Sequence, residues 1–150
     1  MSYAQETTVP VSRSRDEIER TLTRYGATAF ASGWQPQAAA VQFDMRGRRV
    51  QFVVPLPGAD AFVRTPTGRA RSASQARAAM EQEHRRLWRC LALVIKSKLE
   101  AIESGIVSFD EELAMHFVLP DGTSVAQRVL PGIEAAYDRG DLRPLLAIGH

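Results

Sequence analysis

The most constraining feature of this sequence is an uninterrupted stretch between Ser72 and Gly105. From residue 73 to residue 104 it contains neither glycine nor proline, and it is rich in residues that lose little conformational freedom in a helix. Ser72 with Gln75 forms a capping-box pattern at its start, and Gly105 readily adopts the left-handed conformation that ends helices. The pattern therefore predicts a single helix of about 46 Å, at roughly 1.5 Å per residue.

One side of this predicted helix is apolar. At about 100° per residue, the apolar stripe comprises Ala73, Ala76, Met80, Leu87, Leu91, Val94, Ala101 and Ile102. Arg85, Arg89 and Lys96 fall opposite the stripe and are expected on the most exposed face. His84 lies near the edge of the stripe and Lys98 near its centre. Lys98 either extends its apolar stem along the surface with its charge in water, or is held in a cleft by an acid or an anion.

The chain before this helix changes to a period of two. Alternation of apolar and polar residues predicts strands at residues 28–34, 39–46 and 49–55. A two-residue turn at Gly47–Arg48 would pair Phe43 with Phe52 and place the apolar side chains on one face. We therefore expect an α+β fold, in which a three-stranded antiparallel β-meander packs by one face on the long central helix.

Additional N- and C-terminal helices are predicted on either side of this unit. A capping box at Ser14–Glu17 begins an N-terminal helix after a loose tail at residues 1–11, and similar boxes at Ser108–Glu111 and Ser124–Gln127 begin C-terminal helices. A length of 150 residues fits a single domain over residues 1–150.

Charge is unevenly distributed along the chain. From Arg46 to Lys98 there are 12 lysines and arginines against 3 acids, whereas residues 99–150 hold 3 against 9. A basic segment of this kind is typical of a face that binds nucleic acid. Alternatively, the acidic C-terminal segment neutralises the basic one, within one molecule or between subunits. Arginines outnumber lysines 17 to 2, which is also the bias expected of a GC-rich genome.

The candidate nucleic-acid contacts are arginines from three places in the basic segment. They lie at the predicted hairpin tip, on the loop of residues 55–71, which contains three prolines and two glycines, and on the outer face of the long helix: Arg46, Arg48, Arg49, Arg64, Arg69, Arg71, Arg85 and Arg89. We expect them to form one contiguous patch that contacts phosphates without reading sequence. Only Phe62 and Trp88 lie near enough to stack on bases.

No catalytic motif occurs in the sequence. Phosphate-binding loops, nucleophile elbows and zinc-binding helices are missing, and three distant histidines with one cysteine do not form a metal site. A cleft holding Lys98, His84 and an acid would nevertheless favour an enzyme. We expect a binding protein with neither cofactor nor metal. Without an apolar run for a signal peptide or membrane span, the sequence predicts a cytoplasmic protein that does not bind membranes.

Several stretches resemble a family of short bacteriophage and prophage proteins with no established activity. The similarity is carried by RRLWRCLALVIKSKLEAIESGI (85–106), the VLPDG turn (118–122), RRVQFVVPLP (48–57) and RTPTGR (64–69), and covers most of the chain. The resemblance implies a mobile-element origin and an intracellular setting, and it supplies no active site.

These observations favour a small phage or mobile-element accessory protein that binds DNA or RNA non-specifically through the basic face from Arg46 to Lys98. The alternative is a non-catalytic module that binds a host or phage protein with its charge-divided surface. A homo-oligomer is compatible with both hypotheses, because a long helix with an apolar surplus often dimerises.

Overall fold

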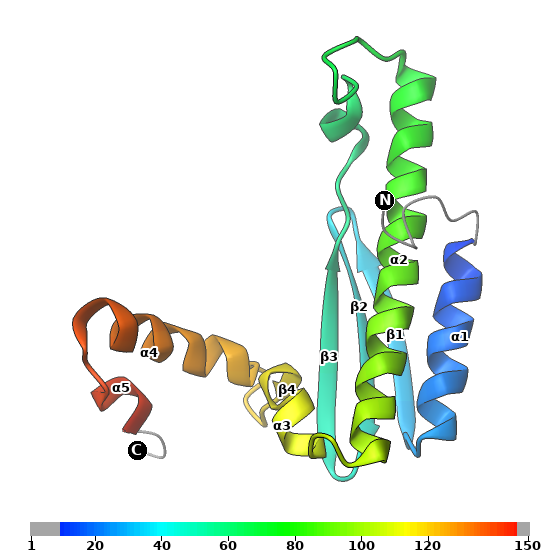
Figure 1. Ribbon diagram of the computed structural model, residues 1–150. Coiled ribbons are helices and arrows are strands. Elements are labelled where there is room, and N and C mark those ends of the chain that lie inside the picture. Colours follow the sequence, from blue (N-terminus) through cyan, green and yellow to red (C-terminus); the bar gives the residue numbers. More distant parts are fainter. Residues whose placement is uncertain (1–9, 147–150) are drawn as a thin grey trace.

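A computed structural model describes residues 10–146 and shows an elongated body with a projecting C-terminal arm (Figure 1). Both the predicted α+β class and the long central helix are confirmed. The elements follow in this order: α1 (Val11–Arg24), β1 (Ala29–Gln35), β2 (Ala38–Met45), β3 (Arg48–Pro55), the 3-10 turn η1 (Ala59–Phe62), α2 (Ala73–Ser104), α3 (Phe109–Leu113), the 3-10 turn η2 (Ala114–His116), β4 (Phe117–Val118), α4 (Val125–Arg139) and α5 (Arg143–Leu146).

Helix α2 begins and ends where its local sequence predicts. The Ser72 hydroxyl accepts the backbone N–H of Gln75, and the Gln75 side chain accepts the backbone N–H of Ser72, so both halves of the capping box are present. Gly105 closes the helix at a φ of 83°, a left-handed conformation that costs glycine least. With 32 residues, α2 is about 48 Å long and runs the length of the body.

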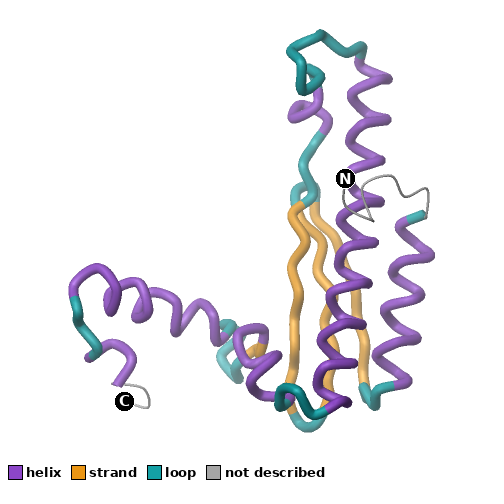
Figure 2. The backbone as a smooth tube through the Cα atoms, in the orientation of Figure 1, coloured by secondary structure: helices purple, strands orange, loops and turns teal. Residues whose placement is uncertain are grey.

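The sheet is antiparallel, in the order β1-β2-β3-β4. Along β2 the buried positions alternate with half-buried ones, from Ala39 to Met45, and these side chains face α1 and α2. Figure 2 shows both helices on the same side of the strands. The core therefore lies between one face of the sheet and this pair of helices, and Val41, Phe43 and Val50 are among its most buried sheet residues.

The predicted pairing of β2 with β3 is wrong by two residues. The turn is formed by Arg46 and Gly47, both at positive φ (52° and 74°), as in a type I′ hairpin whose second central residue is typically glycine. Phe43 consequently faces Val50, and Val41 faces Phe52. Because the shift is even, the same side chains still reach the core face.

The sheet has four strands, so the predicted three-stranded meander is incomplete. Val50 of β3 pairs with Phe117 of β4, and Arg49 pairs with Val118. Helix α3 ends at Leu113, and β4 begins four residues later, at Phe117. Because β4 has only two residues and depends on a partner far away in sequence, no local periodicity indicates it.

The buried face of α2 is rotated from the predicted stripe. Trp88, Ala92, Ile95 and Leu99 join Leu91 in the core, whereas Val94 is 42% exposed. The C-terminal half of α2, which we call its basal half, is covered on two sides, by the sheet and by α1. Its buried residues therefore form a face wider than a single narrow stripe.

Helix α1 begins earlier than its capping-box pattern suggests. Pro10 occupies the N-cap, and Val11 already belongs to the helix, so the predicted tail extends too far at these two residues. Residues 1–9 of that tail lie outside the described part of the chain. Ser14 is fully buried within the helix, and its hydroxyl has no hydrogen-bond partner among the described residues. The extra turn brings Val11 against the core.

The C-terminal arm consists of α4 and α5 and projects from the sheet edge beyond β4 (Figure 1). Helix α4 continues through Pro131. A methyl group added at Gly132 would lie 2.9 Å from a Leu145 side-chain carbon, which shows that α5 packs closely on α4. The described part of this arm does not fold over the basic segment, whereas α3, from the same acidic segment, reaches it where Glu112 bonds Lys98. Within the described residues, no helix is both long and apolar enough to span a bilayer.

Candidate nucleic-acid interface

One end of the body is formed by residues 56–86, which we call the apical lobe. It contains η1, the loop that follows and the first turns of α2, and it lies uppermost in Figure 1. The loop is internally bonded rather than irregular. Arg64 and Ala70 form an isolated antiparallel bridge, and the Thr65 N–H donates to the Arg69 carbonyl at 2.8 Å. Pro66 and Gly68 fit the turn between them, since Gly68 takes a φ of 89°.

Arg71 fastens this loop from within. Its Nη1 atom donates to the backbone carbonyls of Phe62 and Arg64, each at 3.1 Å, and its backbone N–H donates to the Val63 carbonyl at 2.8 Å. The side chain is half-buried. Arg71, which the sequence predicts as a phosphate contact, is therefore first of all a structural residue of the lobe.

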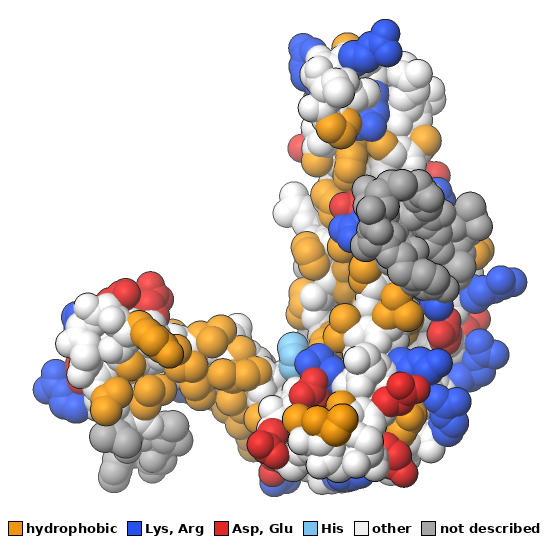
Figure 3. Space-filling view, in the orientation of Figure 1, with side chains coloured by type: hydrophobic (Ala, Val, Ile, Leu, Met, Phe, Trp, Pro, Cys, Tyr) orange, Lys and Arg blue, Asp and Glu red, His pale blue; other side chains and the backbone are white. Residues whose placement is uncertain are grey.

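The other arginines of this end, on the loop and on the first turns of α2, point to solvent without acidic partners among the described residues. Residues 61–80 contain four arginines and no aspartate or glutamate. Arg64, Arg69 and Arg77 are exposed. No ion pair forms at any of them within residues 10–146; Arg64 donates to the Gly68 carbonyl at 3.1 Å. Figure 3 shows this end as a group of basic side chains with few acidic ones near it.

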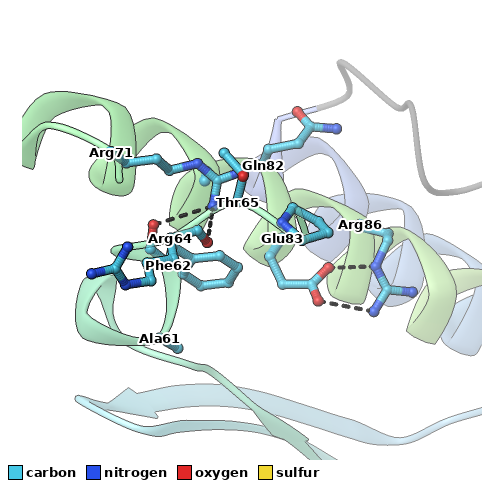
Figure 4. A pocket seen from close by; sticks show the side chains of 10 residues that line it. Ala61, Phe62, Arg64, Thr65, Arg71, Gln82, Glu83 and Arg86 are labelled. Atoms are coloured by element: carbon cyan, nitrogen blue, oxygen red, sulfur yellow. Dashed lines mark hydrogen bonds and ion pairs between the residues drawn. The ribbon is translucent and has the colours of Figure 1, made fainter. Parts of the chain in front are cut away.

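A cleft of about 750 Å³ lies in the lobe, between the loop and α2. Its loop side carries Phe62 and Arg64, and its helix side carries Glu83 and Arg86 (Figure 4). Glu83 and Arg86 form a two-bonded ion pair one helical turn apart. This bond raises the pKa of Arg86. The Glu83 carboxylate is thus neutralised by a neighbour.

The three arginines at the hairpin tip are in a different situation. Arg49 Nε donates to the Asp44 carboxylate at 2.9 Å, and this hydrogen bond lowers the pKa of Asp44. The guanidinium of Arg46 lies 5.1 Å from the centre of the Phe109 ring, in a cation–π contact. Only Arg48 faces solvent without an acid or a ring, and it bonds the adjacent Gly47 carbonyl.

The two helical arginines also have partners. Arg85 donates twice to the Gln82 side-chain oxygen, at 3.2 and 2.7 Å. Arg89 was predicted on the wettest face of the helix, but its Nη1 lies 2.6 Å from the Glu17 carboxylate and its side chain is only 16% exposed. Helix α1 covers this position, which corrects the predicted orientation of Arg89.

The predicted contiguous patch does not form. The hairpin tip lies at the basal end of α2 and the loop at the apical end (Figure 1), so the two groups of arginines are separated by much of a helix of about 48 Å. The structure divides the eight predicted residues into an apical group, Arg64, Arg69 and Arg71, a basal group, Arg46, Arg48 and Arg49, and the two helical residues Arg85 and Arg89.

Lys98 and His84 do not share a cleft. They are 14 residues apart on α2, about 21 Å along its axis. His84 Nε2 lies 2.9 Å from the Pro57 carbonyl. Lys98 Nζ instead lies 2.9 Å from the Glu112 carboxylate. The lysine is therefore held by an acid, as one of the two expectations had it, but not in a cleft with His84.

A histidine does lie near Lys98, but it is His116. Its ring stacks on Phe52 with 4.2 Å between centroids. Burial lowers the pKa of His116, the positive charge of Lys98 lowers it further, and Glu112 opposes both effects. Lys98, Glu112 and His116 line none of the clefts described here.

Sequence reasoning missed Arg77, although the acid-free run of residues 61–80 could have indicated it. It named Phe62 and Trp88 as possible stacking residues. Trp88 is 4% exposed and belongs to the core, which leaves Phe62.

No three histidine, cysteine or acidic side chains gather as a metal site within the described part of the chain.

Comparisons of the chain with models of known protein families, with curated proteins and with solved structures find no match. Inference about function therefore rests on geometry and charge.

Proposed function

We propose that this protein binds nucleic acid without sequence preference, and that it does so through the apical lobe. The observation that carries the proposal is the set of exposed arginines at one end of the molecule, Arg64, Arg69 and Arg77, in a run of 20 residues without an acid. A guanidinium without an acidic partner retains its full attraction for phosphate, because no internal carboxylate competes for its N–H groups.

Two further features support this assignment. The N-terminus of α2 lies in the same lobe, at Ser72 and Ala73, and the partial positive charge of a helix N-terminus favours anions. The hairpin tip is the weaker candidate, because Arg49 is neutralised by Asp44 and Arg46 lies over an aromatic ring. Contacts of this kind recognise the phosphate backbone rather than base sequence.

The resemblance to phage and prophage proteins extends the proposal to a biological setting. We take the protein to be an intracellular accessory factor of a mobile element, which acts on DNA or RNA without chemistry of its own.

The test compares two pairs of substitutions that remove the same charge. Arg69→Ala with Arg77→Ala changes the apical lobe, and Arg48→Ala with Arg49→Ala changes the hairpin tip. Binding of a labelled random-sequence duplex is followed by fluorescence anisotropy across a salt series. If both apical arginines contact phosphates, the log–log salt slope of the apical variant becomes shallower by about 1.8, at roughly 0.9 per contact. The hairpin variant retains the wild-type slope.

Two outcomes would contradict the proposal. Equal losses in the two variants would show that net charge alone governs binding. An absence of binding by the wild-type protein at low salt, to both duplex and single strands, would exclude nucleic acid as the partner.

A second candidate function is supported by the arm. Leu130 and Tyr137 on α4 are 52% and 88% exposed, and Leu142 lies exposed between α4 and α5. Figure 3 shows hydrophobic side chains along this arm. Exposed apolar surface on a projecting element is typical of protein–protein contact sites. The partner would be a host or phage protein, or a second copy of the chain.

A pull-down from host lysate distinguishes this function from the first. The wild-type protein and a Leu130→Ser, Tyr137→Ser variant are compared, each with and without nuclease. A protein captured by the wild type after nuclease, and lost in the variant, supports the arm as a protein-binding site. Sedimentation of the purified protein tests self-association separately. Capture and sedimentation that are identical in both forms would contradict this second function.

A further inference from the structure

The apical cleft combines features that a duplex-binding surface does not need. It is concave, its volume of about 750 Å³ lies in the range of small-ligand sites, and it contains one aromatic ring. Phe62 is half-buried at the end of η1, and it takes part in none of the ring–ring contacts found among the described residues. Its ring therefore borders a space rather than another ring.

We propose that this cleft holds an unstacked base of a single-stranded nucleic acid against Phe62. This inference rests on the proposed function, since the same lobe supplies the phosphate contacts. Single-strand binders combine a basic groove with aromatic faces on which bases stack, and the cleft has both kinds of group. Arg64 stands beside Phe62 on the loop, and Arg86 lies across the cleft on α2 (Figure 4).

The charges in the cleft decide which part of a nucleotide enters it. Glu83 would repel a phosphate placed deep in the cleft, although Arg86 neutralises much of its charge. A base carries no charge and offers N–H donors that a carboxylate accepts. The phosphate is therefore expected at the rim, beside the exposed Arg64, and the base between Phe62 and the Glu83–Arg86 pair.

The position of Phe62 is fixed before any ligand binds. Its backbone carbonyl accepts the Arg71 guanidinium at 3.1 Å, and the same guanidinium holds the Arg64 carbonyl. Because the backbone at Phe62 is already held in place, little further ordering of the loop is needed when a base stacks on the ring. The other exposed aromatic residues, Trp34 and Tyr137, do not offer this combination. Trp34 borders a hollow on a face of the sheet, which is lined across three strands by Gly33, Ala40 and Val53 and has no cation, and Tyr137 belongs to the arm.

The test uses an oligothymidylate and an oligouridylate of about 15 nucleotides, together with a duplex of equal length. Phe62→Leu removes the aromatic face and keeps an apolar side chain, whereas Phe62→Tyr retains the ring. We expect Phe62→Leu to weaken single-strand binding roughly 5- to 150-fold and to leave duplex affinity within about twofold of the wild-type value. Phe62→Tyr should bind single strands as the wild type does. Comparison of the two oligonucleotides distinguishes DNA from RNA.

A base analogue whose fluorescence is quenched by stacking gives an independent reading. An oligonucleotide carrying 2-aminopurine should lose emission on binding the wild type and Phe62→Tyr, but not on binding Phe62→Leu. If Phe62→Leu binds single strands and duplex as the wild type does, the stacking inference is wrong while the proposed function stands. If the wild type binds neither probe, both fail together.

Discussion

The two halves of α2 differ in how they are covered and in how their charges are balanced. Five of the six buried residues of the helix lie between Trp88 and Leu99, and only Ala76 lies in the apical half. Two basal cations have acidic partners: Lys98 bonds Glu112 and Arg89 bonds Glu17. Within the described residues, the apical arginines Arg64, Arg69 and Arg77 have no acidic partner. The basal half therefore stabilises the fold, and the apical half presents positive charge to solvent.

This difference shows how a single long helix can serve two purposes. In the basal half, packing against the sheet and α1 buries apolar area and leaves cations at the margin, where acids from other elements reach them. In the apical half, η1 packs on the helix, and Pro10 and Val11 at the start of α1 border a hollow with His84 and Arg85. The loop there is stabilised chiefly by local hydrogen bonds, and within the described residues Arg86 is the lobe's arginine that forms an ion pair, with Glu83; Arg64, Arg69 and Arg77 form none.

The largest expected effect concerns the packing contrast. Leu91→Ala should lower the free energy of unfolding by about 2–5 kcal/mol, because it leaves a cavity between α2 and the sheet. Met80→Ala, at a half-buried position of the apical half, should cost less than half as much. Urea denaturation of both variants measures the two losses. Similar losses would show that the apical half is packed as well as the basal half.

The next effect concerns the order of the apical lobe. Arg71→Ala leaves the Phe62 and Arg64 carbonyls without their charged donor, which should lower the local opening free energy of the loop by about 1.5–3 kcal/mol. Hydrogen exchange at the Thr65 and Arg71 amides should accelerate, while the midpoint of global unfolding changes little. Arg69→Ala is the matched control and should leave exchange unchanged. Unaltered exchange in Arg71→Ala would mean that packing alone orders the loop.

A pH effect is expected at the basal end. Burial lowers the pKa of His116 below its ordinary value of 6.5, so the unfolded chain binds more protons than the folded one just below that pH. Stability is complete above about pH 6.5 and should fall as pH decreases, until the folded His116 also protonates, with a slope of at most about 1.4 kcal/mol per pH unit from this group.

Urea midpoints between about pH 8 and pH 5 measure this slope. His116→Gln should remove the contribution, whereas His84→Gln, at the apical end, should not. A steeper loss in the His84 variant than in the His116 variant would contradict the assignment.

The smallest effect concerns α1, which covers the basal half. Ser14 is fully buried and its hydroxyl lacks a partner within the described chain, so Ser14→Ala should stabilise the protein by about 1 kcal/mol. Thr23→Ala serves as the control, because the exposed Thr23 hydroxyl donates to the Glu19 carbonyl at 2.8 Å. Thermal unfolding compares the two. A destabilised Ser14 variant would show that the hydroxyl is satisfied after all.

Local features were predictable from the sequence, and features that depend on distant partners were not. The caps of α2 involve residues three positions apart, and they are where the pattern predicted them. The rotation of α2 depends on which two elements cover it, and β4 depends on pairing with β3. The hairpin register depended on recognising that Gly47 takes the second place of the turn.

The candidate site shows the same division. The arginines were identifiable as a basic segment, and most of the apical ones were named. Their pairing was not identifiable, because Arg89 meets Glu17 from 72 positions away and Lys98 meets Glu112 from 14 positions away. Local sequence does not report which acids approach a given cation. The acid-free run of residues 61–80 is the exception, since the run itself holds no carboxylate that could pair with its arginines.

The length of α2 also isolates its two ends electrostatically. The ends lie about 48 Å apart, whereas the Debye length at physiological ionic strength is about 8 Å. A charge changed in the lobe is thus scarcely felt at the hairpin tip, and the free-energy effects of substitutions at the two ends should add within about 0.3–0.5 kcal/mol. The apical lobe can accordingly accept new side chains, and with them new ligands, without a matching adjustment of the fold that supports it.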